Sequence, residues 1–309
     1  MSAEFTIPSD AAMDPADIAQ IELYILRRMR EISPGDHASI AAGSGINLMG
    51  LRDWQAGDPI TSVDWPQSSL NNFSPLITRQ FEEDRHATVL TLVDASQSTL
   101  CGLRNQRIGT AVARAVAAIG FSAAFFQDAF GFVSFGDRFE ALHAERARTG
   151  RSHVLHCLNR LLRSESVGMR EQVGNAAATL SGYLAKASLV PVVSDFLFPN
   201  VAAVIDELAA VNTVHDVLLV MVDARLAFDL PATSAGWIEV FDVESGRMQT
   251  LSSREATDLT RRVEEWQRSV QWVAQANGLD VVKVGLDRWQ SENALSALVA
   301  ERRVRKVRM

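Results

Sequence analysis

Residues 87–99 read Ala-Thr-Val-Leu-Thr-Leu-Val-Asp-Ala-Ser-Gln-Ser-Thr, and this stretch decides the fold. Its first half is a short run of β-branched and apolar residues, typical of a strand that is buried on both faces of a parallel sheet. The run ends in three oxygen-bearing side chains, Asp94, Ser96 and Ser98. Because ligands of open α/β sheets bind at the carboxyl ends of the strands, we expect a site here. One carboxylate and two hydroxyls are hard oxygen donors that suit Mg²⁺.

The spacing of these three residues leaves a second interpretation open. Asp and Ser are also the ordinary residues of turns and helix caps, so they commonly follow a strand without binding anything. The Asp-x-Ser-x-Ser pattern at the end of a buried strand is compatible with both interpretations.

Beyond residue 87, predicted strands alternate with predicted helices, which is the pattern of a doubly wound, mostly parallel α/β sheet. The strands are expected at 87–94, 131–135 with an antiparallel partner at 138–142, 189–194, 214–222 and 279–285. The helices are expected at 104–127, 151–164, 171–186, 200–211, 253–277 and 290–304, and a hairpin joins 237–242 to 247–251. Three of the strands end in Asp94, Asp195 and Asp223, whose carboxylates would meet at one edge unless a cation or donors compensate them.

The sequence before residue 87 indicates two further regions. Asp14-Pro15 starts a helix that ends at Ser33-Pro34-Gly35, with Asp14 as the cap and Pro15 at its first position. Residues 35–86 show no helical periodicity and many Gly and Pro residues. We therefore divide the chain into an N-terminal helix (1–34), a β-rich subdomain packed on the main domain (35–86, with strands near 46–54 and 75–83) and the α/β domain (87–309).

Within the β-rich region, Asp64, Trp65 and Arg79 form a candidate partner-binding surface. The alternative, which the sequence favours slightly, is a buried salt bridge with an aromatic plug that joins two layers. Both interpretations stay open.

Composition limits the function classes. The chain has 309 residues, 47% of them hydrophobic, and a net charge of −7, which argues against a general nucleic-acid binder. The cysteines are few and the N-terminus lacks a secretory pattern, so we expect a cytoplasmic protein without a membrane span. The last nine residues are strongly basic, which indicates a solvated helix face or a surface for an acidic partner.

The sequence motifs that would indicate a catalytic site are weak or absent. Ser194 lacks the flanking glycines of a nucleophile elbow, and no phosphate-binding Gly-x-x-x-x-Gly-Lys loop is present. His153, His156 and Cys157 have helical spacing that zinc binding could use, but an exposed helix face explains them better. We therefore expect no enzyme.

Several motifs together resemble a known family. Asp94-x-Ser96-x-Ser98 with the later Ser194-Asp195 resembles the metal-ion-dependent adhesion site of von Willebrand factor type A domains. The further motifs are Arg52, Gly57-Asp58, Val63-Asp64-Trp65, Leu76-Ile-Thr-Arg79 and Glu82, followed by Asp242-x-Glu244-x-Gly246. This set is similar to the bacterial family called domain of unknown function 58, which is often encoded beside MoxR-type AAA+ ATPases.

The resemblance implies a Rossmann-like type A domain that works by binding. In such sites Asp94, Ser96, Ser98 and Asp195 would hold Mg²⁺, directly or through water, and a partner's carboxylate would fill the open position. A loop threonine normally completes the set, but the corresponding segment, 166–170, contains none.

The main functional hypothesis is a non-enzymatic assembly factor that acts with a MoxR-type AAA+ ATPase on an unknown client protein through this site. One alternative is a metal-dependent hydrolase that uses Asp94 and Asp195. Another is a scaffold whose metal site has decayed.

Overall fold

The computed structural model describes residues 13–32, 42–82, 87–103, 106–136, 141–163, 180, 182–184, 186–198, 200–225, 237–242, 247–285 and 288–307. The strands are β1 (Ala42–Asp53), β2 (Ile77–Glu82), β3 (Thr88–Asp94), β4 (Gly102–Leu103), β5 (Gln106–Arg107), β6 (Ala129–Phe135), β7 (Ala141–Arg148), β8 (Leu189–Ser194), β9 (Asp216–Val222), β10 (Trp237–Asp242), β11 (Arg247–Ser252) and β12 (Asp280–Val284). The helices are α1 (Pro15–Ile32), α2 (Trp65–Leu70), α3 (Ile108–Phe125), α4 (Arg151–Arg163), α6 (Val201–Asn212), α8 (Ser253–Ala276) and α9 (Arg288–Val307), with 3-10 turns η1 (Ile60–Ser62) and η2 (Gln97–Leu100).

The centre of the fold is a six-stranded sheet in the order β12-β9-β8-β3-β6-β7. Neighbouring strands run parallel except at one edge, where β7 runs antiparallel to β6. The strand that carries Asp94 therefore lies in the middle of the sheet, beside the strand that leads to Asp195. The predicted fold class, a Rossmann-like α/β domain with a central, mostly parallel sheet, is confirmed.

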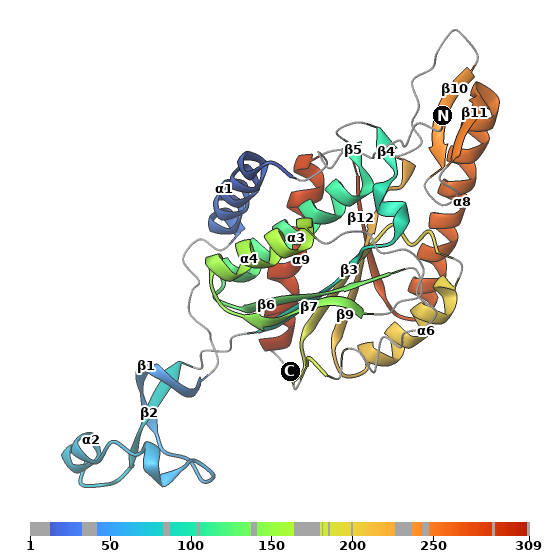
Figure 1. Cartoon of the computed structure of the whole chain (residues 1–309). Coiled ribbons are helices and arrows are strands. Elements are labelled where there is room, and N and C mark those ends of the chain that lie inside the picture. The colour runs from blue at the N-terminus through green and yellow to red at the C-terminus, as the bar shows by residue number, and fades with distance from the viewer. Residues whose placement is uncertain are drawn as a thin grey trace.

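Helices cover both faces of the sheet (Figure 1). In β3, Val89 and Val93 point into a core formed with α1, α3, α4 and α9, whereas Leu90 and Leu92 join a second core under α6 and α8. This alternation follows from the period of two of a β-strand. Because both faces of β3 are buried, the strand must be apolar throughout, as residues 89–93 largely are.

Some element boundaries differ from the prediction. The antiparallel partner of β6, expected at 138–142, is β7 at Ala141–Arg148. The helix expected from 104 begins at Ile108, because β4 and β5 form a small hairpin directly before it. The helix predicted at 171–186 falls mostly outside the described residues.

Helix α3 is long and apolar enough, by length and composition alone, to span a membrane. In the structure most of it is buried, with Val116, Ala117 and Ala118 fully enclosed. A core helix of this kind passes the same test, so the composition of α3 is explained by its position between the sheet and α1 and α4.

Ion pairs attach the terminal helices to the domain. Glu22 of α1 pairs with Arg151 at the start of α4. Arg302 of α9 is only 6% exposed and pairs with Asp216 and Asp280, which begin β9 and β12. The expectation that the basic C-terminal residues form a solvated face is therefore wrong for Arg302, whose charge is used inside the fold.

Strands β1 and β2 pair in antiparallel fashion and, with η1 and α2, form a unit that we call the 42–82 unit. Figure 1 shows this unit standing out from the body that contains the six-stranded sheet. The strands expected near 46–54 and 75–83 are thus confirmed. The division of the whole chain into three parts stays a prediction.

Candidate metal centre

The predicted ligands Asp94, Ser96 and Ser98 lie at the carboxyl end of the central strand β3. Asp94 is 2% exposed, and its Oδ1 accepts a hydrogen bond of 2.8 Å from the backbone N–H of Ser96. The hydroxyl oxygens of Ser96 and Ser98 are 2.9 Å apart, so the two side chains converge. The Thr99 hydroxyl donates to the Ser96 carbonyl at 2.7 Å, which fixes the turn after the strand.

Asp195 lies on the neighbouring strand end. β3 and β8 are paired in parallel with Val93 opposite Val193, so Ser194 and Asp195 follow beside Asp94. Asp195 is fully buried, and its Oδ1 accepts a hydrogen bond of 2.9 Å from the Leu197 N–H. The structure therefore brings the four predicted ligands to one edge of the sheet.

Ser194, which lacks the sequence context of a nucleophile and is not among the predicted ligands, connects the ends of β3 and β8. Its hydroxyl donates to Asp94 Oδ2 and accepts from the Phe196 N–H at 2.8 Å. It thereby joins the two strand ends that carry the acidic ligands. The sequence contains no local signal for this contact, since the partners are 100 residues apart.

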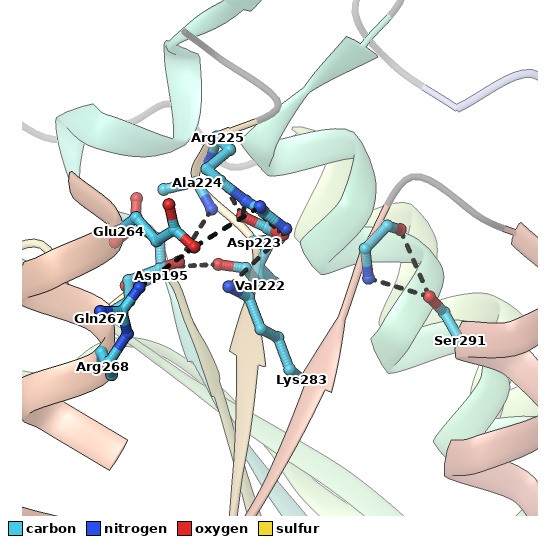
Figure 2. Close-up of polar contacts among 11 residues, drawn as sticks. Asp195, Val222, Asp223, Ala224, Arg225, Glu264, Gln267, Arg268, Lys283 and Ser291 are labelled. Carbon is cyan, nitrogen blue, oxygen red and sulfur yellow. Dashed lines mark hydrogen bonds and ion pairs between the residues drawn. The ribbon is translucent and has the colours of Figure 1, made fainter. Parts of the chain in front are cut away.

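Asp223 reaches the same edge at the end of β9, but its charge is compensated by the chain itself. Arg225 donates to both of its carboxylate oxygens, with Nη2 2.6 Å from Oδ2, and Lys283 Nζ lies 3.4 Å away (Figure 2). Burial by itself would raise the pKa of Asp223, yet these cationic neighbours hold it below its usual value. Asp223 is thus part of an ion-pair network with Arg225, Lys283 and Glu264.

The donor set at Asp94, Ser96, Ser98 and Asp195 fits a hard divalent cation. Two hydroxyl oxygens already converge, and the Ser96 N–H and the Ser194 hydroxyl, both uncharged donors, orient the carboxylate of Asp94. Mg²⁺ prefers such oxygen ligands and commonly uses one or two carboxylates with retained water. Within the described residues, no cluster of three or more His, Cys, Asp or Glu side chains is suited to a metal, so hydroxyl ligands are essential to this candidate. The segment 166–170, where a threonine is expected, lies outside the described residues.

The zinc alternative at His153, His156 and Cys157 finds no support. Burial raises the pKa of the Cys157 thiol to about 12, which disfavours the thiolate that zinc requires. His156 lies 3.5 Å from Glu145, on a helix face that is partly exposed. The exposed-face interpretation fits His156, which is exposed, and His153, which is half-buried, but it is wrong for Cys157, which lies in the core.

The residues Asp64, Trp65 and Arg79 lie together in the 42–82 unit. Asp64 caps α2 by accepting from the Gln67 N–H at 3.1 Å, and Arg79 Nε donates to its other oxygen at 2.9 Å. The hydrogen bond from Arg79 is the main reason why the pKa of Asp64 is lowered. Trp65 is 53% exposed, so the interpretation as an aromatic plug is wrong, because its ring does not lie between two layers. Whether these residues bind a partner stays a prediction.

The sequence matches the family model described as Protein of unknown function DUF58 over residues 50–271. This match covers more than half of the chain, and the chain therefore belongs to the DUF58 family. The predicted membership is confirmed, and the matched region contains both the candidate metal centre and most of the 42–82 unit.

The chain is also similar to other bacterial proteins, in sequence to some and in structure to others. Uncharacterized proteins of Mycobacterium tuberculosis and Mycobacterium bovis are each 27% identical over 250 residues, which cover 77% of this chain and 73% of theirs. Among solved structures, conserved hypothetical protein BatB from Bacteroides thetaiotaomicron has a TM-score of 0.45 at 13% identity. An aerotolerance-related membrane protein from Bacteroides fragilis has a TM-score of 0.43 at 12% identity. Each of these two alignments covers 70% of this chain and 99% of the other.

Proposed function

We propose that this DUF58 protein is a non-enzymatic interaction and assembly factor of the cytoplasm. It would work with a MoxR-type AAA+ ATPase on a client protein complex and bind its partner through a divalent cation at Asp94, Ser96, Ser98 and Asp195. The observation that carries this proposal is the convergence of the Ser96 and Ser98 hydroxyls, 2.9 Å apart, beside a buried carboxylate at the carboxyl end of the central strand.

The chemistry of such a contact is electrostatic. A bound Mg²⁺ would supply positive charge to a carboxylate of the partner, since it keeps coordination positions that the protein does not fill. The residues of this chain orient the site: Ser194 and the Ser96 N–H hold the Asp94 carboxylate, and the Leu197 N–H holds that of Asp195. Because these donors are fixed before binding, little ordering remains when a partner arrives.

The test is binding of this chain to a purified MoxR-type AAA+ ATPase of its own organism, measured by surface plasmon resonance in Mg²⁺ and in a chelator. Asp94→Ala is expected to remove the Mg²⁺-dependent binding, whereas Asp258→Ala, on the outer side of α8, keeps it. Equal binding by Asp94→Ala and the wild type would rule out the cation-bridged contact. Mg²⁺-dependent cleavage of a generic phosphoester that Asp195→Asn abolishes would instead favour the hydrolase.

A second candidate, a scaffold with a decayed metal site, has one observation in its favour. The 42–82 unit exposes large apolar side chains at Ile60, Trp65, Leu70 and Phe73, each at least 53% accessible. Large exposed apolar side chains within one small unit favour a protein interaction site there. Partner binding that is unchanged by a chelator and lost in Trp65→Ala would favour this candidate over the first.

A further inference from the structure

Two neighbouring residues of α8, Trp266 and Gln267, reach the turn that follows β8. Gln267 is only 1% exposed, and its Nε2 donates to the carbonyl oxygens of Asp195 at 3.0 Å and Val222 at 2.7 Å. Its Oε1 accepts from the Ala224 N–H at 3.4 Å. Figure 2 shows this side chain between the ends of β8 and β9. A single buried carboxamide thus connects α8 to the ends of both strands.

The turn that Gln267 contacts has an uncommon backbone conformation. Phe196, the residue after Asp195, has a φ of +57°, in the left-handed region that bulky side chains rarely adopt. Trp266 Nε1 donates to the Phe196 carbonyl at 2.8 Å, and the Phe196 N–H donates to Ser194. The Phe196 ring is fully buried in the core under α6 and α8. Such conformations persist only where the surroundings over-determine them, and they are concentrated at functional sites.

The orientation of the Asp195 carboxylate depends on this turn. Its Oδ1 accepts from the Leu197 N–H, and the position of that N–H is set by the φ of Phe196. Release of the turn would therefore move both the carboxylate and the donor that orients it. Mutation of residues that orient metal ligands through hydrogen bonds commonly lowers metal affinity by about 10- to 100-fold.

We propose that Trp266 and Gln267 are positioning residues of the candidate metal centre, which hold the Asp195–Phe196 turn in its left-handed conformation. The expected effect on metal affinity rests on the proposed function. The left-handed turn and the hydrogen bonds that hold it do not require a metal. Helix α8 is thus the structural support of the site, although no residue of α8 is a predicted ligand.

The test compares Gln267→Met and Trp266→Phe with two controls on the same helix, Gln275→Met and Trp272→Phe. The side chains of Gln275 and Trp272 are exposed, so the same substitutions there leave the turn intact. The first measurement is backbone hydrogen exchange of residues 196–198 by mass spectrometry, on the full chain without metal. The second is Mn²⁺ affinity by calorimetry, with the melting temperature of each variant.

We expect exchange in this segment to rise about tenfold in Gln267→Met and Trp266→Phe but not in the controls, since each loses hydrogen bonds to the turn. Mn²⁺ affinity should fall about tenfold or more in the same two variants. Exchange that is unchanged, or that rises equally throughout the protein, would overturn the proposal. So would unchanged Mn²⁺ affinity in variants of a chain that binds the ion. If the wild type binds no Mn²⁺, the cation-bridged function fails, and the exchange measurement alone decides the role of the two residues.

Discussion

The carboxyl edge of the six-stranded sheet and the 42–82 unit both contain fixed acidic side chains, but the donors differ. In the 42–82 unit, Asp58 accepts two hydrogen bonds of 2.7 Å from Arg52, and Asp64 pairs with Arg79. At the sheet edge, a backbone N–H and a hydroxyl donate hydrogen bonds to Asp94. An arginine compensates the charge of the carboxylate that it orients, whereas a neutral donor orients a carboxylate without adding a positive charge.

This difference separates a site that is suited to a cation from a unit that is suited to a protein surface. The acidic groups of the 42–82 unit stabilise its own turns, and its outer side shows apolar residues such as Trp65 and Leu70. The groups at the sheet edge are buried and preorganised, with the ligands supplied by β3 and β8. The two regions therefore favour different modes of binding within one chain.

Tight packing between β6 and β7 makes the sheet sensitive to a single added methyl group. A Cβ on Gly131 of β6 would lie 2.5 Å from the Glu145 carbonyl oxygen and 2.7 Å from the Ala147 nitrogen, both in the backbone of β7. Gly131→Ala should therefore lower the free energy of unfolding by about 1–3 kcal/mol, because the strands must move apart. Urea denaturation followed by circular dichroism measures this change.

The matched substitution in the 42–82 unit is Gly50→Ala. A Cβ on Gly50 of β1 meets nothing within 4 Å, so the change should stay within about 0.5 kcal/mol. If Gly131→Ala and Gly50→Ala lower the free energy of unfolding equally, the packing at Gly131 is no tighter than the packing at Gly50.

A smaller effect concerns the pH response of the 42–82 unit. Hydrogen bonds from Arg52 lower the pKa of Asp58 from its ordinary value of 3.8 to about 2. Because the folded pKa is the lower one, the stabilisation by this pair is complete above pH 3.8 and disappears as the pH falls through about 2. The indole N–H resonance of Trp54 reports on it, since Nε1 donates to the Asp58 carbonyl at 3.2 Å.

Substitution of Arg52 tests whether this residue is the cause of the lowered pKa of Asp58. Arg52→Lys loses the two-pronged contact, so the transition of the Trp54 resonance should move up towards pH 3.8. A transition that stays in place would assign the lowered pKa to a source other than Arg52.

Much of the fold could be predicted from local sequence patterns. Helix α1 and strand β8 agree with their predicted residues. A capped amphipathic helix and a buried apolar strand can both be recognised from the pattern of consecutive residues. The hairpin of β10 and β11 was recognisable for the same reason. The four candidate ligands were found because parallel strands bring their carboxyl ends to one edge, and the topology confirms that they meet there.

The supporting residues could not be found in this way. Gln267 contacts Asp195 across 72 residues of sequence, and in the sequence it is one polar residue among many on an amphipathic helix. The pairing of Arg302 with Asp216 and Asp280 was hidden because a basic residue near a helix end is usually exposed. The exposure of Trp65 could not be predicted either, because the 42–82 unit stands out from the body that contains the six-stranded sheet, an arrangement that local patterns do not encode.

We expect the sheet edge to bind a divalent cation and the acidic groups of the 42–82 unit to bind none. The test is calorimetric titration of Mg²⁺ and Mn²⁺ into the wild type, Asp94→Ala and Asp58→Ala. We expect saturable binding by the wild type and by Asp58→Ala, and none by Asp94→Ala. Absence of binding by the wild type, or equal binding by Asp94→Ala, would contradict the claim.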